Sequence, residues 1–302
     1  MKIYLRINLT DPDTATLLAS DPVIGKATFP YVSPPVGGIW FKKAIDVENS
    51  VFDRILEFTR TSPGIKFLRH MTFTNKEISQ FSHFELFPKK ILNDSDKEYD
   101  ATWTYYNELP LIRTEAKWPI KLLDRLYLAS CRVKENAIAV YGHWTNEYVC
   151  GKVTSELINS CDLTGIHTIP VFCIKSKKEL TDCNQLFSNS ILPKALNDAS
   201  VFETVDDNSP ESTPRRYACL SYSYLELNTF NDFNRTAEPW GPWDFPSWVI
   251  SHRAYEQMLT NKIPFRVQPV FDCDSEIYQV YIKKWKAVLT KLTSNSNHQI
   301  MA

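Results

Sequence analysis

Glycine is scarce in this sequence, with only 8 residues among 302. Gly37-Gly38 is the sole adjacent pair, and neither G-x-G-x-x-G nor G-x-x-x-x-G-K occurs. Loops that cradle a phosphate group need the backbone freedom of glycine. The scarcity therefore argues against dinucleotide binding and P-loop nucleotide binding, and we expect no cofactor.

Short-range metal and nucleophile motifs are also missing. The seven cysteines include no C-x-x-C pair, and the six histidines form neither H-x-H nor H-E-x-x-H. A structural zinc site normally shows such spacing, and a hydrolase serine normally sits in a G-x-S-x-G turn, which is absent too. We therefore expect no metal ligand and no catalytic residue.

The net charge and the absence of long apolar runs argue against binding to nucleic acid or membranes and against a membrane-spanning helix. The formal net charge is -1, so no overall basic field favours nucleic acid or an anionic membrane. No window approaches the roughly 20 apolar residues of a membrane helix. The first ten residues, MKIYLRINLT, lack a charged segment leading into an apolar run, so we expect no secretory signal and a cytoplasmic protein.

The residues that are present predict an α+β fold of mixed sheets and short helices. Met1 to Leu9 alternates apolar and polar residues, which is typical of a half-buried strand. Helices are predicted from Ser50 onward, over Trp118 to Ala129, and over Asp274 to Leu292, and a strand is predicted over Tyr217 to Leu227. The polar tail from Thr293 predicts a frayed end.

One stretch, Trp248 to Phe271, reads as a complete strand-helix-strand unit. Ser251 is the expected N-cap of its helix, and the second strand ends in Pro269-Val-Phe. A shorter version, Val153 to Phe172, also has an apolar pair on its helix and also ends in Pro-Val-Phe. A weaker third copy starts near Phe67 and contains the capping-box pattern Thr74-Asn-Lys-Glu77.

These units suggest how the chain is organised. The polar, acidic stretch Asn93 to Asp100 is the best internal boundary. We expect an N-terminal α+β region over residues 1–100 and a C-terminal α+β region over 101–302 with the clearer repeats. The regions are either two related halves or parts of one continuous domain.

Aromatic and acidic segments are the candidates for a partner-binding surface. Three of the eight tryptophans lie between positions 240 and 248, and acidic residues gather at 203–211 and around Cys273, as Asp272, Asp274 and Glu276. Such segments serve as core packing and solvated loops, or as anchors and charges that bind a basic partner. The residues predicted to bind a partner are Trp240, Trp243, Asp244, Trp248, Asp206, Asp207 and Glu211.

A nuclease-like pattern gives an alternative function. Asp100 followed by Glu115-Ala-Lys117 resembles the arrangement in which two carboxylates hold Mg²⁺ and a lysine assists the attacking water. The same spacing arises by chance in a chain with 69 charged residues, where a solvated face is the competing interpretation.

The strand Trp248-Val-Ile-Ser251, the helix after it and the strand Phe265-Arg-Val-Gln-Pro269-Val resemble a known C-terminal signature. It is found in bacterial immunity-type proteins linked to polymorphic toxins, a group that includes the double-CXXCG-motif proteins. This sequence has no CXXCG pair, so no zinc element is carried over. The resemblance covers about 45 residues and brings no catalytic residues.

The resemblance implies inhibition by binding. The expected function is that of a cytosolic immunity protein that occludes a cognate toxin effector without catalysis. Besides the Mg²⁺-dependent nuclease, an adaptor or interaction module remains the other alternative. The sequence leaves the identity of the toxin and the oligomeric state open.

Overall fold

Three mixed sheets and short helices build the chain, which confirms the predicted α+β class. A computed structural model describes residues 1–9, 12–28, 30–32, 39–41, 43–59, 65–92, 111–113, 119–122, 126–128, 133–141, 147–173, 175–196, 202–203, 216–217, 219–240, 245–293 and 298–301. In this part of the chain, none of the helices has the length and apolar character needed to cross a membrane.

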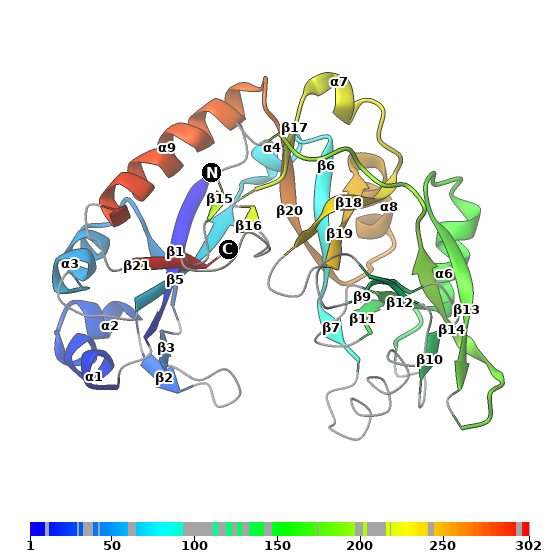
Figure 1. Ribbon diagram of the computed structural model, residues 1–302, viewed down its shortest axis with the longest axis horizontal. Helices are drawn as coiled ribbons and strands as arrows, with labels where there is room; N and C mark the ends of the chain where they lie inside the picture. Colours follow the sequence, from blue (N-terminus) through cyan, green and yellow to red (C-terminus); the bar gives the residue numbers. More distant parts are fainter. Residues whose placement is uncertain are drawn as a thin grey trace.

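The N-terminal sheet, whose strands are blue in Figure 1 except for the red β21, is centred on β1, in which the inward-facing Ile3, Leu5 and Ile7 are buried. β1 pairs antiparallel with β5 along its whole length, and the predicted first strand is thereby confirmed. The strands of this sheet are β1 (Lys2–Leu9), β2 (Pro30–Val32), β3 (Ile39–Phe41), β4 (Ile45–Asp46), β5 (Ile65–Thr72) and β21 (His298–Met301). Its N-terminal helices are α1 (Pro12–Ser20), α2 (Ile24–Thr28) and α3 (Ser50–Thr59).

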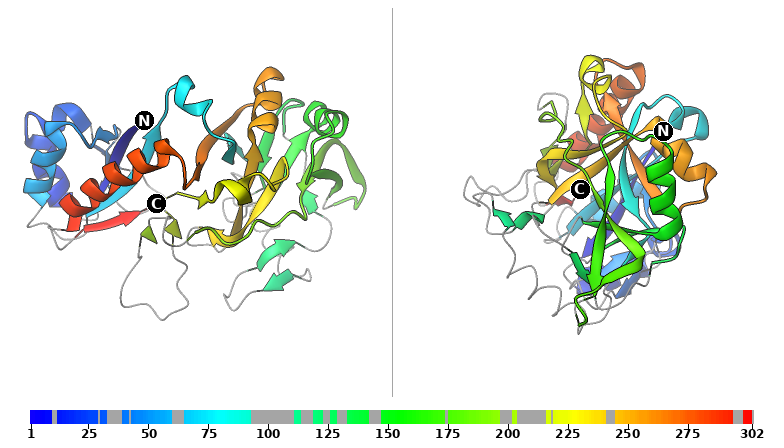
Figure 2. Two further views of the ribbon diagram at one scale, coloured as in Figure 1. Left: turned by 90° about the horizontal axis from the view of Figure 1, so that it is seen from above. Right: turned by 90° about the vertical axis from the view of Figure 1, so that its right-hand side faces the viewer.

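Helix α9 (Glu276–Thr293) connects the C-terminal sheet with the N-terminal part of the molecule. It leaves β20, crosses the N-terminal sheet and reaches α3, as Figures 1 and 2 show. Tyr278, Tyr281 and Trp285 are buried at helical spacing, and the Tyr281 ring stacks on Phe271 at a centroid distance of 4.7 Å. At its far end Lys291 pairs with Asp53 of α3 at 2.7 Å.

The middle sheet and the C-terminal sheet share one arrangement of strands. The middle sheet has the order β10-β13-β14-β12-β11-β7, and the C-terminal sheet has the order β17-β20-β6-β19-β18. In each, an edge strand runs parallel to the strand that follows the helix, and the next three pairings are antiparallel. The two sheets are therefore structural repeats of each other.

The elements of the middle sheet are β7 (Lys90–Ile91), β10 (Leu126–Leu128), β11 (Ile138–Val140), β12 (Tyr148–Gly151), α6 (Lys152–Ser160), β13 (His167–Cys173) and β14 (Glu179–Phe187). Those of the C-terminal sheet are α4 (Asn75–Ile78), β6 (His83–Pro88), β17 (Ser221–Tyr222), α7 (Tyr224–Leu227), β18 (Phe233–Trp240), β19 (Phe245–Ser251), α8 (His252–Thr260) and β20 (Phe265–Asp272). Two small ribbons complete the described part: β8 (Leu111–Arg113) with β9 (Pro119–Leu122), and β15 (Phe202–Glu203) with β16 (Arg216–Tyr217).

The two strand-helix-strand units predicted from the sequence are confirmed as β12-α6-β13 and β19-α8-β20. Their helices have N-caps at Gly151 and Ser251, and each is followed by a residue with positive φ, Asp162 or Lys262. A residue in the left-handed region is the usual way to end a helix before the chain turns back. The same backbone device thus occurs twice, with different side chains.

Strand β6 is the exception to this repetition. In the middle sheet the central position is taken by β14, which follows β13 directly along the chain. In the C-terminal sheet the same position is taken by β6, from residues 83–88, which pairs with β19 and β20. A unit restricted to residues 101–302 would therefore lack the central strand of this sheet.

The two sheets pack through equivalent residues. Tyr148 of β12 and Trp248 of β19 hold the same position in their units, and their rings stack at 5.3 Å with an interplanar angle of 19°. The Tyr148 hydroxyl donates a hydrogen bond of 2.7 Å to the Leu86 carbonyl of β6. Helices α6 and α8 lie beside this core, and Arg253 of α8 donates to the carbonyl of Asp162, in the turn after α6, at 2.6 Å.

Three sequence-based predictions of secondary structure were wrong. The helix expected over Trp118 to Ala129 is replaced by β9 and β10, in which Leu126 and Leu128 are buried at the two-residue spacing of a strand. Residues 298–301 of the polar tail form β21, parallel to β5. The strand expected over Tyr217 to Leu227 includes the helix α7, whose capping box is formed by Ser223 and Glu226.

Candidate functional site

Ser251, His252 and Arg253 bring a hydroxyl, an imidazole and a guanidinium together at the start of α8. Ser251 is the N-cap, as predicted, because its hydroxyl accepts a hydrogen bond from the Ala254 amide at 3.1 Å. The same hydroxyl donates to Asp232 at 2.6 Å, and the Arg253 guanidinium donates to that carboxylate at 2.7 Å. His252 is hydrogen-bonded through Nδ1 to the Phe81 carbonyl at 2.8 Å.

Asp232 is the residue that sequence reasoning missed. It is buried at the start of β18, and it also accepts from the backbone amide and the hydroxyl of Thr164 at 2.9 and 3.0 Å. Thr164 follows α6, so Asp232 ties the two strand-helix-strand units together. No short-range pattern pointed to it, because its partners lie 19 to 68 residues away.

Hydrogen bonds from neighbouring residues stabilise the ionised form of the Asp232 carboxyl group. Burial alone would raise the pKa of this carboxyl, but the hydrogen bonds from Ser251, Thr164 and Arg253 outweigh burial and lower the pKa below 3.8. A carboxylate with this many donors is stabilised as an anion and has little tendency to accept a further proton. The cluster therefore serves structure rather than acid–base chemistry.

Replacing Asp232 with asparagine should lower the free energy of unfolding by about 2 kcal/mol near pH 7, because hydrogen bonds to a charged acceptor are worth more than neutral ones. Since its folded pKa is depressed, the contribution of Asp232 is present above about pH 4 and is lost as pH falls through the folded value. Urea unfolding at pH 7 measures the change. Unfolding of the asparagine variant at the wild-type urea midpoint would contradict this role.

Trp248 was predicted to bind a partner, and the structure corrects that prediction. The side chain is only 1% exposed, lies against Tyr148, and carries the Arg235 guanidinium 4.6 Å above its ring. Arg235 in turn pairs with Glu147 at 3.7 Å, and Gln185 donates to Glu147 at 3.0 Å. Trp248 therefore belongs to the contact between the two sheets, not to an accessible surface.

The other predicted contact residues are only partly within the described chain. Trp240 is the last residue of β18, and Phe245 opens β19 opposite it, so the tryptophan-rich segment connects two paired strands. Trp243 and Asp244 in this connection lie outside the described residues, as do Asp206, Asp207 and Glu211. The nuclease candidates Asp100, Glu115 and Lys117 also lie outside them, so the described residues bring none of that pattern together.

Asp272, Cys273 and Asp274 are the one metal-ligand grouping among the described residues, with ligand atoms within 4.8 Å of one another. Asp272 already accepts a hydrogen bond from the Asp274 amide at 2.9 Å. Burial, followed by the charges of Asp274 and Asp272, raises the pKa of the Cys273 thiol. A raised pKa disfavours the thiolate that a metal would need, so the group does not have the chemistry of a cysteine-ligated metal centre.

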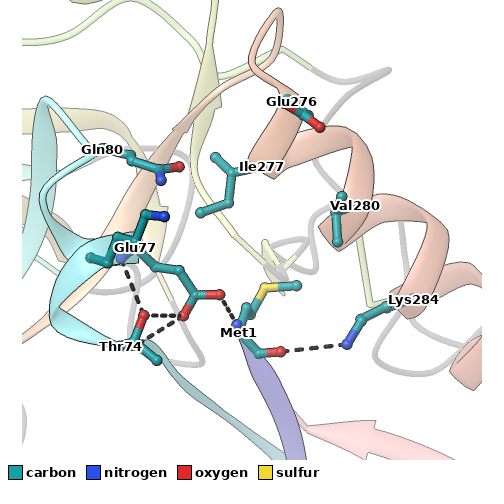
Figure 3. A pocket seen from close by; sticks show the side chains of 9 residues that line it. Met1, Thr74, Glu77, Gln80, Glu276, Ile277, Val280 and Lys284 are labelled. Carbon is teal, nitrogen blue, oxygen red and sulfur yellow. Dashed lines mark hydrogen bonds and ion pairs between the residues drawn. The ribbon is translucent and has the colours of Figure 1, made fainter.

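A pocket of about 530 Å³ lies between α4 and α9 (Figure 3). Its apolar lining comes from Met1, Ile277 and Val280, and charged groups surround it. Glu77 binds the Met1 amine and completes the capping box with Thr74, while Lys284 pairs with Glu48 at 2.8 Å. The charges that line the pocket without an ion pair among the described residues are Lys76 and Glu276.

No protein-family model matches the chain, and a search of curated proteins finds no match.

Proposed function

We propose that this protein is an immunity-type protein that binds and occludes a cognate bacterial toxin made by the same cell. The observation that supports it most is the structural role of residues 248–271, the segment that carries the family resemblance. Ser251 and Arg253 in this segment are bonded to Asp232, and Trp248 lies in the core. The segment is therefore a scaffold unit in which these side chains hold the fold together.

A repeated scaffold of this kind suits stoichiometric binding. Two like sheets pack face to face and present helices and strand connections outward, while the buried polar groups hold the sheets together. Specific and stable protein–protein interfaces bury about 1,600 Å² in total, an area that such an outer surface can supply. No cofactor enters the proposal.

Co-expression tests the proposal directly. If a gene next to this one encodes a toxin domain, cells that express that domain should survive when this chain is co-expressed, and the two products should co-purify as a stoichiometric complex. Asp232→Asn provides a destabilised control: a loss of about 2 kcal/mol from a typical stability of about 5–15 kcal/mol leaves the chain almost fully folded, so this variant should protect nearly as well as the wild type. Failure of the wild-type chain to rescue cells from that toxin would overturn the proposal.

A second measurement separates binding from catalysis. The purified chain should show no Mg²⁺-dependent cleavage of DNA or RNA, and Glu115→Ala should protect cells as well as the wild type. Cleavage that disappears in Glu115→Ala while toxin binding persists would instead favour the nuclease alternative.

A further inference from the structure

Among the described helices, α7 carries the two most exposed large apolar side chains. Tyr224 is 58% exposed and Leu225 is 77% exposed, whereas Leu227 on the inner side is 2% exposed and packs into the core. The helix is short but fixed, because Ser223 and Glu226 form a reciprocal capping box. The exposed pair is therefore presented in a defined orientation.

The fold does not require apolar residues at these two positions. Helix α4 has the same capping box, made by Thr74 and Glu77, and likewise precedes a strand of the C-terminal sheet. The positions that correspond to Tyr224 and Leu225 are occupied there by Asn75 and Lys76, which are both exposed and polar. The tyrosine and leucine thus need an explanation other than local stability.

Acidic residues lie next to this apolar pair. The Tyr224 amide donates to the Asp274 carboxylate at 3.4 Å, so α7 touches the chain just before α9. Asp274 and Glu276 are exposed, and Asp272 is partly so. Glu276 is also on the rim of the pocket of Figure 3, where Val280, one helical turn further on, is 45% exposed.

These residues form one continuous surface, which we name the α7–α9 surface: Tyr224, Leu225, Asp274, Glu276 and Val280. Two apolar side chains project from one end, two carboxylates occupy the middle, and an open pocket with an apolar lining lies at the other end. Two cations near this surface have no ion pair among the described residues: Lys76, on the opposite wall of the pocket, and the exposed Lys283, three residues after Val280 on α9. With the partly exposed Asp272, three carboxylates lie beside these two cations, so the surface complements a positively charged one.

We propose that the α7–α9 surface docks a basic face of the cognate toxin. Tyr224 and Leu225 enter an apolar depression on the toxin, and Asp274 and Glu276 pair with lysine or arginine side chains around it. Rigid tyrosine anchors commonly contribute a large share of the affinity of an interface, whereas charged pairs mainly set the association rate and its salt dependence. This inference rests on the proposed function and names the surface that carries it out.

The first test removes the apolar anchors while keeping a sequence that this type of helix already uses. The double variant Tyr224→Asn/Leu225→Lys copies the pair found in α4, so it should fold with an unchanged melting temperature. Its dissociation constant for the purified toxin domain of the neighbouring gene should rise about 100-fold, as for the loss of two interface anchors. Titration calorimetry measures the change.

A matched control makes the same chemical change elsewhere. Val153 on α6 and Leu259 on α8 are also exposed apolar side chains, on two helices that are not part of the α7–α9 surface. The variant Val153→Lys/Leu259→Asn again replaces one apolar residue with lysine and one with asparagine. It should bind the toxin domain with wild-type affinity.

The charges are tested by kinetics. Asp274→Asn/Glu276→Gln keeps side-chain shape and an acceptor for the Tyr224 amide, but should slow association about tenfold at low salt and flatten its salt dependence. Glu156→Gln/Asp182→Asn, the same neutralisation at exposed positions of α6 and β14, should leave both unchanged.

The outcomes distinguish a wrong α7–α9 surface from a wrong proposed function. If the wild type binds and protects but both α7–α9 variants do so equally well, the surface is wrong while the proposed function stands. If the wild-type chain does not bind the toxin domain, the proposed surface and the proposed function are both wrong. If the wild type is a dimer by sedimentation and Tyr224→Asn/Leu225→Lys is a monomer with intact toxin binding, the surface joins two copies of this chain and the inference is overturned.

Discussion

Replacing Trp248 with alanine is expected to lower the free energy of unfolding by about 4 kcal/mol, because a large buried aromatic is lost and a cavity remains. The indole lies between the Tyr148 ring and the Arg235 guanidinium, at the contact of the two repeated sheets. Its removal also leaves Arg235 without the ring face that covers it. Urea unfolding followed by circular dichroism measures the loss, and the midpoint should shift without a change in slope.

Two variants control this result. Trp248→Phe keeps an aromatic ring against Tyr148 and should lose less than half as much stability. Tyr224→Ala removes an exposed aromatic residue and should stay within about 0.5 kcal/mol of the wild type. A cost below 1 kcal/mol for Trp248→Ala would show that the sheets do not pack through this residue.

Acidification from pH 7 to pH 5 should lower the free energy of unfolding by about 2 kcal/mol through His83. This histidine is buried, and among the described residues its Nε2 has no hydrogen-bond partner. Burial lowers the pKa of His83 from 6.5 to about 4, partly offset by the charge of Asp232. The folded state therefore binds fewer protons than the unfolded state between these values, and each pH unit in that window costs about 1.4 kcal/mol.

The direction of the stability change and the pH range in which it occurs distinguish His83 from Asp232 as its source. Stability from the neutral imidazole is complete above about pH 6.5 and falls as pH drops toward 4, whereas the contribution of Asp232 is lost only below about pH 4, as pH falls through its depressed folded pKa. His83→Phe preserves the edge-on contact with Phe230 and should flatten the stability profile between pH 7 and 5. An unchanged slope in that variant would assign the acid sensitivity to another group.

Local sequence signals predicted the parts of the fold that depend on neighbours along the chain. The alternation in β1, the helices from Ser50 and toward Leu292, and the caps at Thr74 and Ser251 follow from short-range periodicity and hydrogen bonding. The capping box of Ser223 and Glu226 was equally readable from its S-x-x-E spacing. It was missed because the surrounding aromatic residues favoured a strand.

Long-range pairing could not be predicted in the same way. Leu126 and Leu128 fit either a helix or a strand until β13 provides a partner for β10. The role of Asp232 depends on Thr164 and Arg253, which come from different units. Trp248 illustrates the same limit, since a tryptophan-rich segment looks identical in sequence whether its rings face solvent or another sheet.

The position of β6 has a consequence for the way the chain is made. On the ribosome this strand emerges early, with Phe84 and Leu86 on its buried face, but β19 and β20 are synthesised much later. Both of its backbone edges stay unpaired through that interval, which favours association with other nascent chains. Premature termination after the middle sheet would thus release a fragment with an open, apolar strand that no later part of the molecule can cover.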